Sequence, residues 1–241
     1  MKNMLRWLGI IAIVLVTGFY LAGCGGSYSV VSGNFEFDSD SGTIIGYDNN
    51  ASKRVTLPST IDGIRVTAIG KNAFRGKRLI SVTNLANISS IEEGAFAENQ
   101  LTSVIFGSNI TSIGASAFED NKLETVTIPN SVLVIGENAF IKNQLTSVIL
   151  GSKVTGIGKQ AFAENYLSSI TIPNSVTTIE KDAFSGNVLT SITIGPNKKF
   201  ASNIVPNFAK TYDNNGKESG TYIRVDSSTW KKEQIAISNS K

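Results

Sequence analysis

The sequence of 241 residues predicts a β-rich, right-handed solenoid of parallel strands and short helical or 3₁₀ turns, capped by β-hairpins at both ends. Three observations predict this fold. Residues 57–188 repeat every 22 residues, each unit places the same kinds of apolar side chain at the same positions, and the period fails on both sides. One such unit is too short to bury its own apolar face, so the units must stack along a common core.

The first 23 residues have the layout of a lipoprotein signal peptide. Lys2 and Arg6 form a basic start, and residues 7–22 are an apolar or small-residue run. This run is shorter than the roughly 20 residues that a permanent transmembrane helix needs. Residues 21–24, Leu-Ala-Gly-Cys, resemble the lipobox of bacterial lipoproteins. In these proteins the cysteine is acylated on sulfur, the peptide is cut before it, and the new amino group is often acylated as well. We expect a lipid on Cys24; the alternative is a plain export signal or an uncleaved anchor.

Two segments are expected between this cysteine and the repeats. Residues 24–33 are rich in Gly and Ser and predict a flexible tether. Residues 34–56 predict an N-terminal β cap, because Phe35 and Phe37 alternate with polar residues and residues 43–47 read as a second strand. The solenoid is expected over residues 57–195, and its first unit carries an insertion at residues 61–64.

Each repeat predicts two strands and one turn. Position 1 is Leu, and apolar positions 4 and 6 alternate with Ser, Thr or Ile at positions 3 and 5, as in residues 103–106, which indicates a half-buried strand. Positions 10 and 13 indicate a second short strand, after a turn that alternates between Gly-Ser and Pro-Asn. Ala-Phe at positions 17 and 18 is expected in a short helical or 3₁₀ turn, with the ring in the core.

Position 21 is asparagine in five consecutive units. Asn tolerates left-handed backbone and can bond backbone groups that lack a partner, so we expect it to turn the chain and form a stacked ladder. The ladder consists of Asn99, Asn121, Asn143, Asn165 and Asn187.

Residues 196–241 predict a C-terminal β-hairpin cap and tail. Aromatic residues including Tyr212, Tyr222 and Trp230 flank an Asn215-Gly216 turn. We expect them to form a lid on the last repeat, because terminal repeats must be covered. The alternative is a stacking surface for carbohydrate. The lysine excess of this region is expected to be a solvated surface.

The repeats resemble the BspA-like, or Treponema-type, leucine-rich repeats. The resemblance rests on Leu-x-x-Val-x-Ile, Pro-Asn-Ser-Val-x-x-Ile-Gly and Ala-Phe, as in residues 123–140 and 167–184. The commoner leucine-rich pattern has Asn or Cys three residues after the strand apolar residue, where this chain has Asn109, Ser131, Lys153 and Ser175. The resemblance implies a parallel sheet along one face and a binding role, often at a bacterial surface, without naming a ligand.

The outward residues of the first strand are the candidate binding face. They are uncharged and mostly carry hydroxyl groups, which suits broad contact with a protein or glycan. Ser and Thr are also ordinary residues of a solvated strand. The face comprises Ser103, Ile105, Thr125, Thr127, Ser147, Ile149, Ser169, Thr171, Ser191 and Thr193.

Composition argues against most enzyme and metal chemistry. The chain has no His and one Cys, so a His-based nucleophile, a usual zinc site and an internal disulfide cannot be assembled. The acidic pairs Glu92-Glu93 and Glu119-Asp120 are sequence neighbours with no counterpart across a pocket. With ten basic and eleven acidic residues, the segment 57–188 is near neutral and offers no nucleic-acid groove. We expect no catalytic residue, cofactor or metal.

The expected protein is exported and lipid-anchored to the bacterial envelope, at the outer membrane or cell surface. Its solenoid would bind proteins or glycans of host or neighbouring cells, in the manner of an adhesin. The alternative is a periplasm-facing structural or envelope-assembly scaffold lipoprotein. Protease treatment of whole cells separates these two hypotheses.

Overall fold

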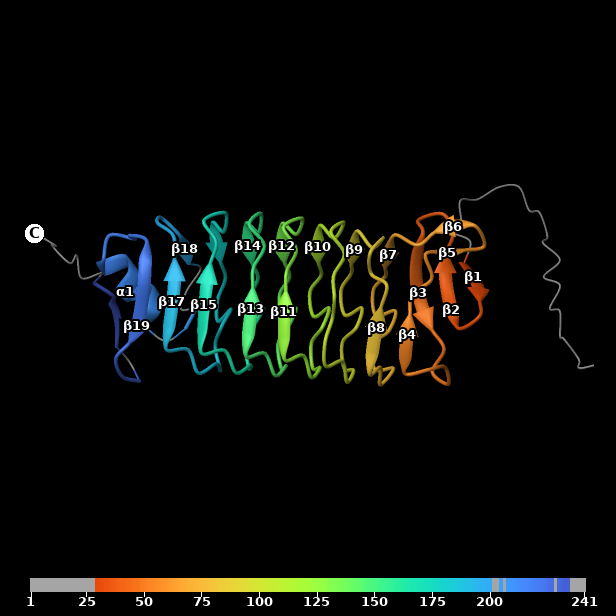
Figure 1. The fold of residues 1–241 in the computed structure, drawn as a ribbon, viewed down its shortest axis with the longest axis horizontal. Helices are drawn as coiled ribbons and strands as arrows, with labels where there is room; N and C mark the ends of the chain where they lie inside the picture. Colours follow the sequence, from red (N-terminus) through yellow and green to blue (C-terminus); the bar gives the residue numbers. More distant parts are fainter. Residues whose placement is uncertain (1–28, 201–203, 206, 228, 235–241) are drawn as a thin grey trace, which may run out of the picture.

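The computed structural model describes residues 29–200, 204–205, 207–227 and 229–234. These residues form one elongated stack of coils with a β cap at each end (Figure 1), which confirms the predicted solenoid. The predicted signal peptide, residues 1–23, and Cys24 lie outside the described residues.

Three antiparallel strands form the N-terminal cap. They are β1 (Ser29–Ser32), β2 (Phe35–Asp38) and β3 (Thr43–Tyr47), with a register shift between Glu36 and Phe37. The expected pair β2–β3 is present. The expected tether of residues 24–33 is wrong over residues 29–32, because all four residues of β1 pair with β2 and Val30 packs against the core. Local composition missed this strand, since only pairing with β2 stabilises it.

A ten-stranded sheet runs the length of the molecule along one side. It continues the cap in the order β1-β2-β3-β7-β9-β10-β12-β14-β16-β18, and every pair from β3 onward is parallel. Each repeat from β7 to β16 contributes its positions 12 and 13, which confirms the predicted second strand, and β18 follows β16 after a step of 21 residues. These strands are β7 (Ala68–Ile69), β9 (Ser90–Ile91), β10 (Ser112–Ile113), β12 (Val134–Ile135), β14 (Gly156–Ile157), β16 (Thr178–Ile179) and β18 (Lys199–Phe200).

The first strands of the repeats form the opposite side in three shorter sheets. The pairs β4–β8, β11–β13 and β15–β17 are parallel. Because β4 and β18 belong to the stack, the solenoid exceeds the predicted limits of 57 and 195 at both ends. The strands are β4 (Arg54–Thr56), β8 (Ser81–Thr83), β11 (Thr125–Thr127), β13 (Ser147–Ile149), β15 (Ser169–Ile172) and β17 (Ser191–Ile194).

Residues 103–106 do not form the strand that the sequence predicts. Their one strand-like pairing is a bridge between Leu85 and Phe106, a step of 21 residues instead of 22. The cause lies one coil earlier, where Asn84 adopts a left-handed φ of 66° and displaces the following residue by one position. Pairing of residues 103–105 with β8 would need a step of 22 residues, whereas the bridge from Leu85 to Phe106 has a step of 21. Residues 103–106 therefore cannot satisfy both pairings.

The insertion in the first repeat is a two-stranded hairpin. Strands β5 (Thr60–Ile61) and β6 (Ile64–Arg65) pair antiparallel across Asp62 and Gly63. Both turn residues have positive φ, 50° and 81°, which is the backbone of a type I′ turn and suits an Asp-Gly sequence.

The Ala-Phe segments are successive turns with the three-residue hydrogen bonds of the expected 3₁₀ turn, and they do not continue into a helix. In the coil at 92–98, Ala95 N–H donates to Glu92 O and Ala97 N–H to Gly94 O, each across three residues. Residues at positions 16 and 20 take left-handed φ values of 52–71°, which stops a helix from continuing. Their N–H groups instead donate to the next coil, as Gly94 does to Ala115 O at 2.8 Å and Glu98 to Glu119 O at 2.8 Å.

The phenylalanines of these turns form a continuous stack through the core. Neighbouring ring centroids lie 5.1–5.6 Å apart and the ring planes differ by 2–16°. All six side chains are fully buried. They are Phe74, Phe96, Phe118, Phe140, Phe162 and Phe184. One ring per coil therefore fills the interior, as the sequence predicts.

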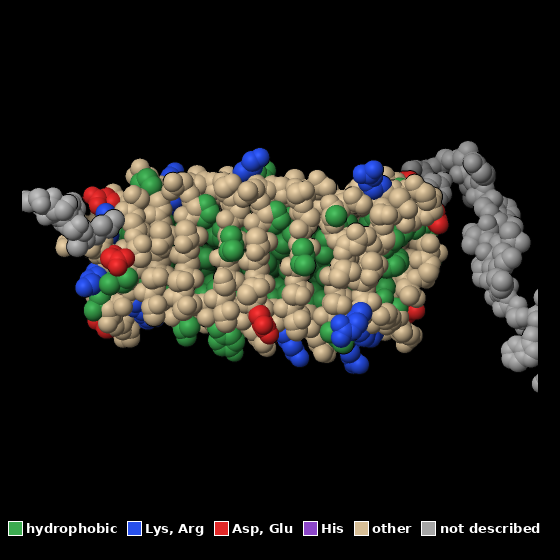
Figure 2. Space-filling model, in the orientation of Figure 1, with side chains coloured by type: hydrophobic (Ala, Val, Ile, Leu, Met, Phe, Trp, Pro, Cys, Tyr) green, Lys and Arg blue, Asp and Glu red, His purple; other side chains and the backbone are tan. Residues whose placement is uncertain are grey.

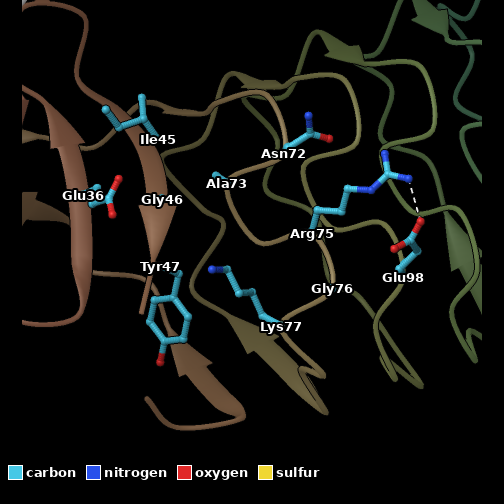
Figure 3. Close-up of a pocket in the computed structure, with 10 residues that line it drawn as sticks. All are labelled: Glu36, Ile45, Gly46, Tyr47, Asn72, Ala73, Arg75, Gly76, Lys77 and Glu98. Atoms are coloured by element: carbon cyan, nitrogen blue, oxygen red, sulfur yellow. Dashed lines mark hydrogen bonds and ion pairs between the residues drawn. The ribbon is translucent and has the colours of Figure 1, made fainter. Parts of the chain in front are cut away.

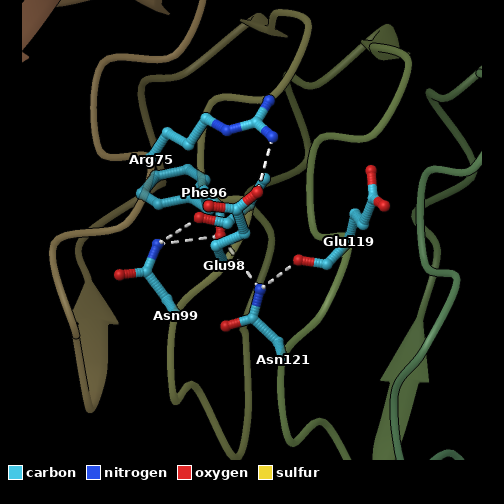
Figure 4. A network of polar contacts seen from close by, with 7 residues as sticks. Arg75, Phe96, Glu98, Asn99, Glu119 and Asn121 are labelled. Carbon is cyan, nitrogen blue, oxygen red and sulfur yellow. Dashed lines mark hydrogen bonds and ion pairs between the residues drawn. The ribbon is translucent and has the colours of Figure 1, made fainter.

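The asparagine ladder is present and joins each coil to the one before it. Asn121 Nδ2 donates to Phe96 O of the previous coil and to two carbonyls of its own turn, while its Oδ1 accepts from Leu101 N–H at 3.1 Å. Figure 4 shows this arrangement for Asn99 and Asn121. The expectation that the asparagines themselves take the left-handed backbone is wrong, because position 20 turns the chain and leaves position 21 to bond it.

The C-terminal cap contains a hairpin, but its turn is not the expected Asn215-Gly216, because residues 208–214 before that turn form a helix. Strands β19 (Gly220–Arg224) and β20 (Trp230–Lys232) pair antiparallel, and β19 also pairs antiparallel with β17. Helix α1 (Phe208–Asn214) packs beneath them. Tyr212 Oη donates to Gly195 O at 2.7 Å, so the helix is fastened directly to the last coil.

Candidate binding face

The structure places the predicted binding face on the outer side of the first strands. Eight of its ten residues, from Ser103 to Thr171, are exposed. Ile105 and Ile149 project furthest, with 83% and 61% of their surface exposed. Between them the buried residues of the same strands, such as Val126, hold the backbone against the core. The outward side chains are therefore presented by a rigid support.

Two predicted residues lie at the end of this face and are partly covered. Ser191 and Thr193 on β17 are half-buried because β19 pairs alongside them. Thr193 Oγ1 lies 3.0 Å from Thr221 Oγ1 of β19. The C-terminal cap thus limits the open face to the coils before β17.

The open face carries almost no charge. Figure 2 shows it in the orientation of Figure 1, with Lys, Arg, Asp and Glu side chains along the upper and lower edges and at the ends. Positions 3 and 5 hold hydroxyl side chains apart from Ile105 and Ile149. Neighbouring coils of a hydrogen-bonded stack are about 4.8 Å apart, so Ile149 on β13 and Ile105 in the strandless coil two before it are separated by about 10 Å. A partner must span at least this distance to contact both.

The alternation of Gly and Pro turns has a steric cause. A Cβ on Gly151 would lie 2.2 Å from Pro129 O, and a Cβ on Gly107 would lie 2.7 Å from Ala86 Cα. A coil that follows Pro129 therefore needs glycine at the same position. Ile105 and Ile149 both belong to Gly-type coils, whereas the coil of Gly195 carries Thr193 at the same position.

The hollows of the surface are shallow and polar. One of about 560 Å³ lies between the N-terminal cap and the first turns, and Figure 3 shows the side chains that line it. Its cations are engaged, since Arg75 pairs with Glu98 and Lys77 Nζ donates to Asn49 Oδ1 at 2.6 Å. Another, of about 480 Å³, lies along the coil edge beside Tyr166, whose surface is 60% exposed.

The C-terminal aromatic residues are a lid and not a carbohydrate platform. Phe208, Tyr212, Tyr222 and Trp230 are at most 4% exposed. Their rings contact one another at centroid distances of 5.3–6.3 Å. The alternative of a stacking surface here is wrong, because the rings seal the open end of the core.

One lysine that the sequence assigns to the solvated surface is buried. Lys198 is 4% exposed, and its Nζ donates to Asn174 O at 2.7 Å. Burial lowers the pKa of this ammonium group. Its position next to the Tyr212 hydroxyl, which accepts from the Lys198 N–H at 3.1 Å, explains the burial. A lysine in a run of mixed residues carries no sequence signal for this.

The acidic pair Glu92-Glu93 serves contacts between coils. Glu93 forms an ion pair with Lys71 at 2.9 Å, and Glu92 Oε2 accepts from the Lys71 backbone N–H at 3.0 Å. In the part of the chain that the structure describes, no group of three or more His, Cys, Asp or Glu residues could hold a metal ion. The described residues likewise contain no helix long and apolar enough to span a membrane.

Comparison with known proteins identifies the repeats and the fold. A family model described as the BspA type leucine-rich repeat region matches residues 67–193 in six copies. A leucine-rich cell surface protein from Faecalibacterium prausnitzii is 21% identical, with a TM-score of 0.52, and the match covers 86% of this chain and 61% of that one.

Two further solved structures have the same fold. A leucine-rich repeat protein from Bacteroides ovatus is 19% identical with a TM-score of 0.52, over 79% of this chain and 56% of its own. The pneumococcal vaccine antigen PcpA is 24% identical with a TM-score of 0.54, over 70% of this chain and 47% of its own. This chain thus spans about half to three-fifths of these proteins. No curated protein matches the sequence.

Proposed function

Because the chain belongs to the BspA-type leucine-rich repeat family, we propose that it is a lipid-anchored bacterial surface protein whose strand face binds a macromolecular partner. The partner is a protein or glycan of a host or neighbouring cell. One observation carries the proposal: the exposed, uncharged face from Ser103 to Thr171, which a buried ladder of strands and asparagines holds rigid. A preorganised face loses little conformational entropy when it binds.

The comparisons support display at a surface. One protein of the same fold is called a cell surface protein and another a vaccine antigen. The mixed hydroxyl and apolar character of the face resembles the composition of ordinary non-obligate interfaces, which are polar over a large fraction of their area. Ile105 and Ile149 supply the apolar points around which such a contact excludes water.

The amino-terminal sequence supports the anchor. A basic start, a short apolar run and Leu-Ala-Gly-Cys at residues 21–24 together match a lipoprotein signal. Durable membrane binding needs two or more acyl chains, which a diacylated and N-acylated Cys24 provides. The Cys24→Ala variant is expected to leave the detergent phase in phase partition. Retention of that variant in the detergent phase would contradict the anchor.

Protease treatment of intact cells tests the surface location. A surface-displayed chain is degraded, while a periplasmic marker in the same cells stays intact. Full protection of the chain would contradict the proposal and favour the envelope scaffold, whose partner should then appear after crosslinking inside the envelope.

A pair of double variants tests the face. Beads coated with the chain carrying Ile105→Lys and Ile149→Lys should bind intact epithelial cells at least ten-fold less than beads carrying the unchanged chain. The control carries Leu133→Lys and Val134→Lys, which are 47% and 49% exposed on the other side of the molecule. Equal binding by both double variants would refute the assignment of the strand face.

A further inference from the structure

The strands that end the sheets at the two ends of the molecule differ in how their edges are protected. Natural proteins place charged side chains on open edge strands to prevent pairing with another chain. Arg54 lies on β4, Lys199 on β18, and Lys231 and Lys232 on β20. Strand β1 carries the sequence Ser-Val-Val-Ser and has no charge at all. It is the end strand without protection against strand addition.

The outer edge of β1 is open among the described residues. The ten-stranded sheet ends at β1, which pairs on one side with β2 and has no described strand on its other side. In Figure 1 it is the outermost strand at the N-terminal end. Val31 is 77% exposed, whereas Val30 packs against the core. The strand is therefore held in an extended conformation with one apolar side chain in solvent.

The position of the anchor favours a second copy of this chain as the occupant. Four residues separate Cys24 from Ser29, so an acylated Cys24 lies at most about 18 Å from β1. Every anchored copy then presents the same edge at the same small height above the membrane. Confinement to this layer raises the effective concentration of one β1 for another, whereas a soluble partner gains nothing from it.

We propose that β1 pairs antiparallel with β1 of a second anchored copy, about a two-fold axis that sets Val31 beside Val31 of the partner. This pairing keeps the core faces of both sheets on the same side, as the alternation of side chains along a strand requires. Only the three strand residues Val30–Ser32 pair in this register, so the contact is short and depends on the membrane. The proposal therefore rests on the lipid anchor of the proposed function.

Disulfide crosslinking of Val31→Cys in intact membranes tests this pairing. With Cys24 acylated, the introduced thiol is the only free one in the chain. Mild oxidation should yield a species of twice the chain mass on a non-reducing gel. The matched control is Ile105→Cys, whose site is also apolar and even more exposed, at 83%. Its dimer yield should be at least ten-fold lower. Adding Ser29→Lys to Val31→Cys should lower the dimer yield at least five-fold.

Three outcomes would overturn the pairing: no dimer from Val31→Cys, equal yields from both cysteine variants, or a crosslinked species of another mass. Phase partition of the same samples reads the anchor separately. A chain that partitions into detergent without crosslinking refutes the pairing alone. A chain that stays in the aqueous phase refutes the anchor, and the pairing with it.

Discussion

Replacing Asn143 by alanine should remove the side-chain hydrogen bonds that join one coil to the coil before it. Asn143 is 5% exposed. Its Nδ2 donates to Phe118 O at 2.9 Å, Phe140 O at 3.2 Å and Ile141 O at 3.3 Å, and its Oδ1 accepts from Leu123 N–H at 3.1 Å. Each bond contributes about 0.5–1.5 kcal/mol net, and a buried N–H left unpaired costs about 1–3 kcal/mol. We expect a loss of about 3–5 kcal/mol.

The Asn143→Asp variant makes the reasoning more specific. It keeps the acceptor for Leu123 but turns a second oxygen toward three carbonyls, so at neutral pH it should be less stable than Asn143→Ala. These surroundings raise the pKa of the new carboxyl group above its unfolded value. The folded state then binds more protons, and the variant should recover stability relative to the unchanged chain as pH falls through that raised pKa.

Urea unfolding followed by circular dichroism measures these losses in the soluble Cys24→Ala chain. The control is Asn109→Ala, an exposed asparagine whose Nδ2 donates to Ala86 O at 2.9 Å; its loss should stay below about 1 kcal/mol. Equal losses for Asn109→Ala and Asn143→Ala would refute the ladder as a source of stability. So would an Asp variant whose deficit does not change with pH.

Three further predictions concern packing and burial. Phe140→Ala empties a fully buried place in the ring stack and should cost about 3–5 kcal/mol in urea unfolding; a loss below about 1 kcal/mol would contradict the stack. Gly151→Ala places a Cβ against Pro129 O and should cost about 1–3 kcal/mol. Gly156→Ala is the control, because its Cβ meets nothing closer than 3.5 Å, and it should be neutral or stabilising. A lower urea midpoint for Gly156→Ala than for Gly151→Ala would refute the steric argument. Burial lowers the pKa of Lys198 in the folded state, so the unchanged chain should gain stability as pH rises toward the pKa of lysine in the unfolded state. The Lys198→Met variant should therefore be more stable than the unchanged chain at neutral pH, and this advantage should shrink as pH rises to about 10. An advantage that does not change with pH would contradict the role of Lys198.

The repetition explains why much of the fold could be predicted from the sequence. Six copies of Ala-Phe and five of Asn at one spacing indicate columns whose members are equivalent, so an error at one repeat is corrected by the others. The buried ring stack, the asparagine ladder, the second strands and the exposure of most of the candidate face were all predictable in this way. The residues of that face could be placed, but their partner stays a prediction.

The features that escaped prediction occur once and depend on a neighbour. Strand β1 exists because β2 pairs with it, and helix α1 because Tyr212 bonds the last coil. The missing strand at residues 103–105 follows from the left-handed Asn84 one coil earlier. None of these has a second copy whose pattern would reveal it.

The sequence by itself determined that this chain is a solenoid, because an apolar pattern of period 22 can be buried only by stacking. It also determined which columns face inward, since their side chains are apolar in every unit. The left-handed turns at positions 16 and 20, the burial of Lys198 and the place of β1 at the end of the described sheet appear only in the folded chain. These features depend on hydrogen bonds and packing between segments far apart in the chain, which no local pattern encodes.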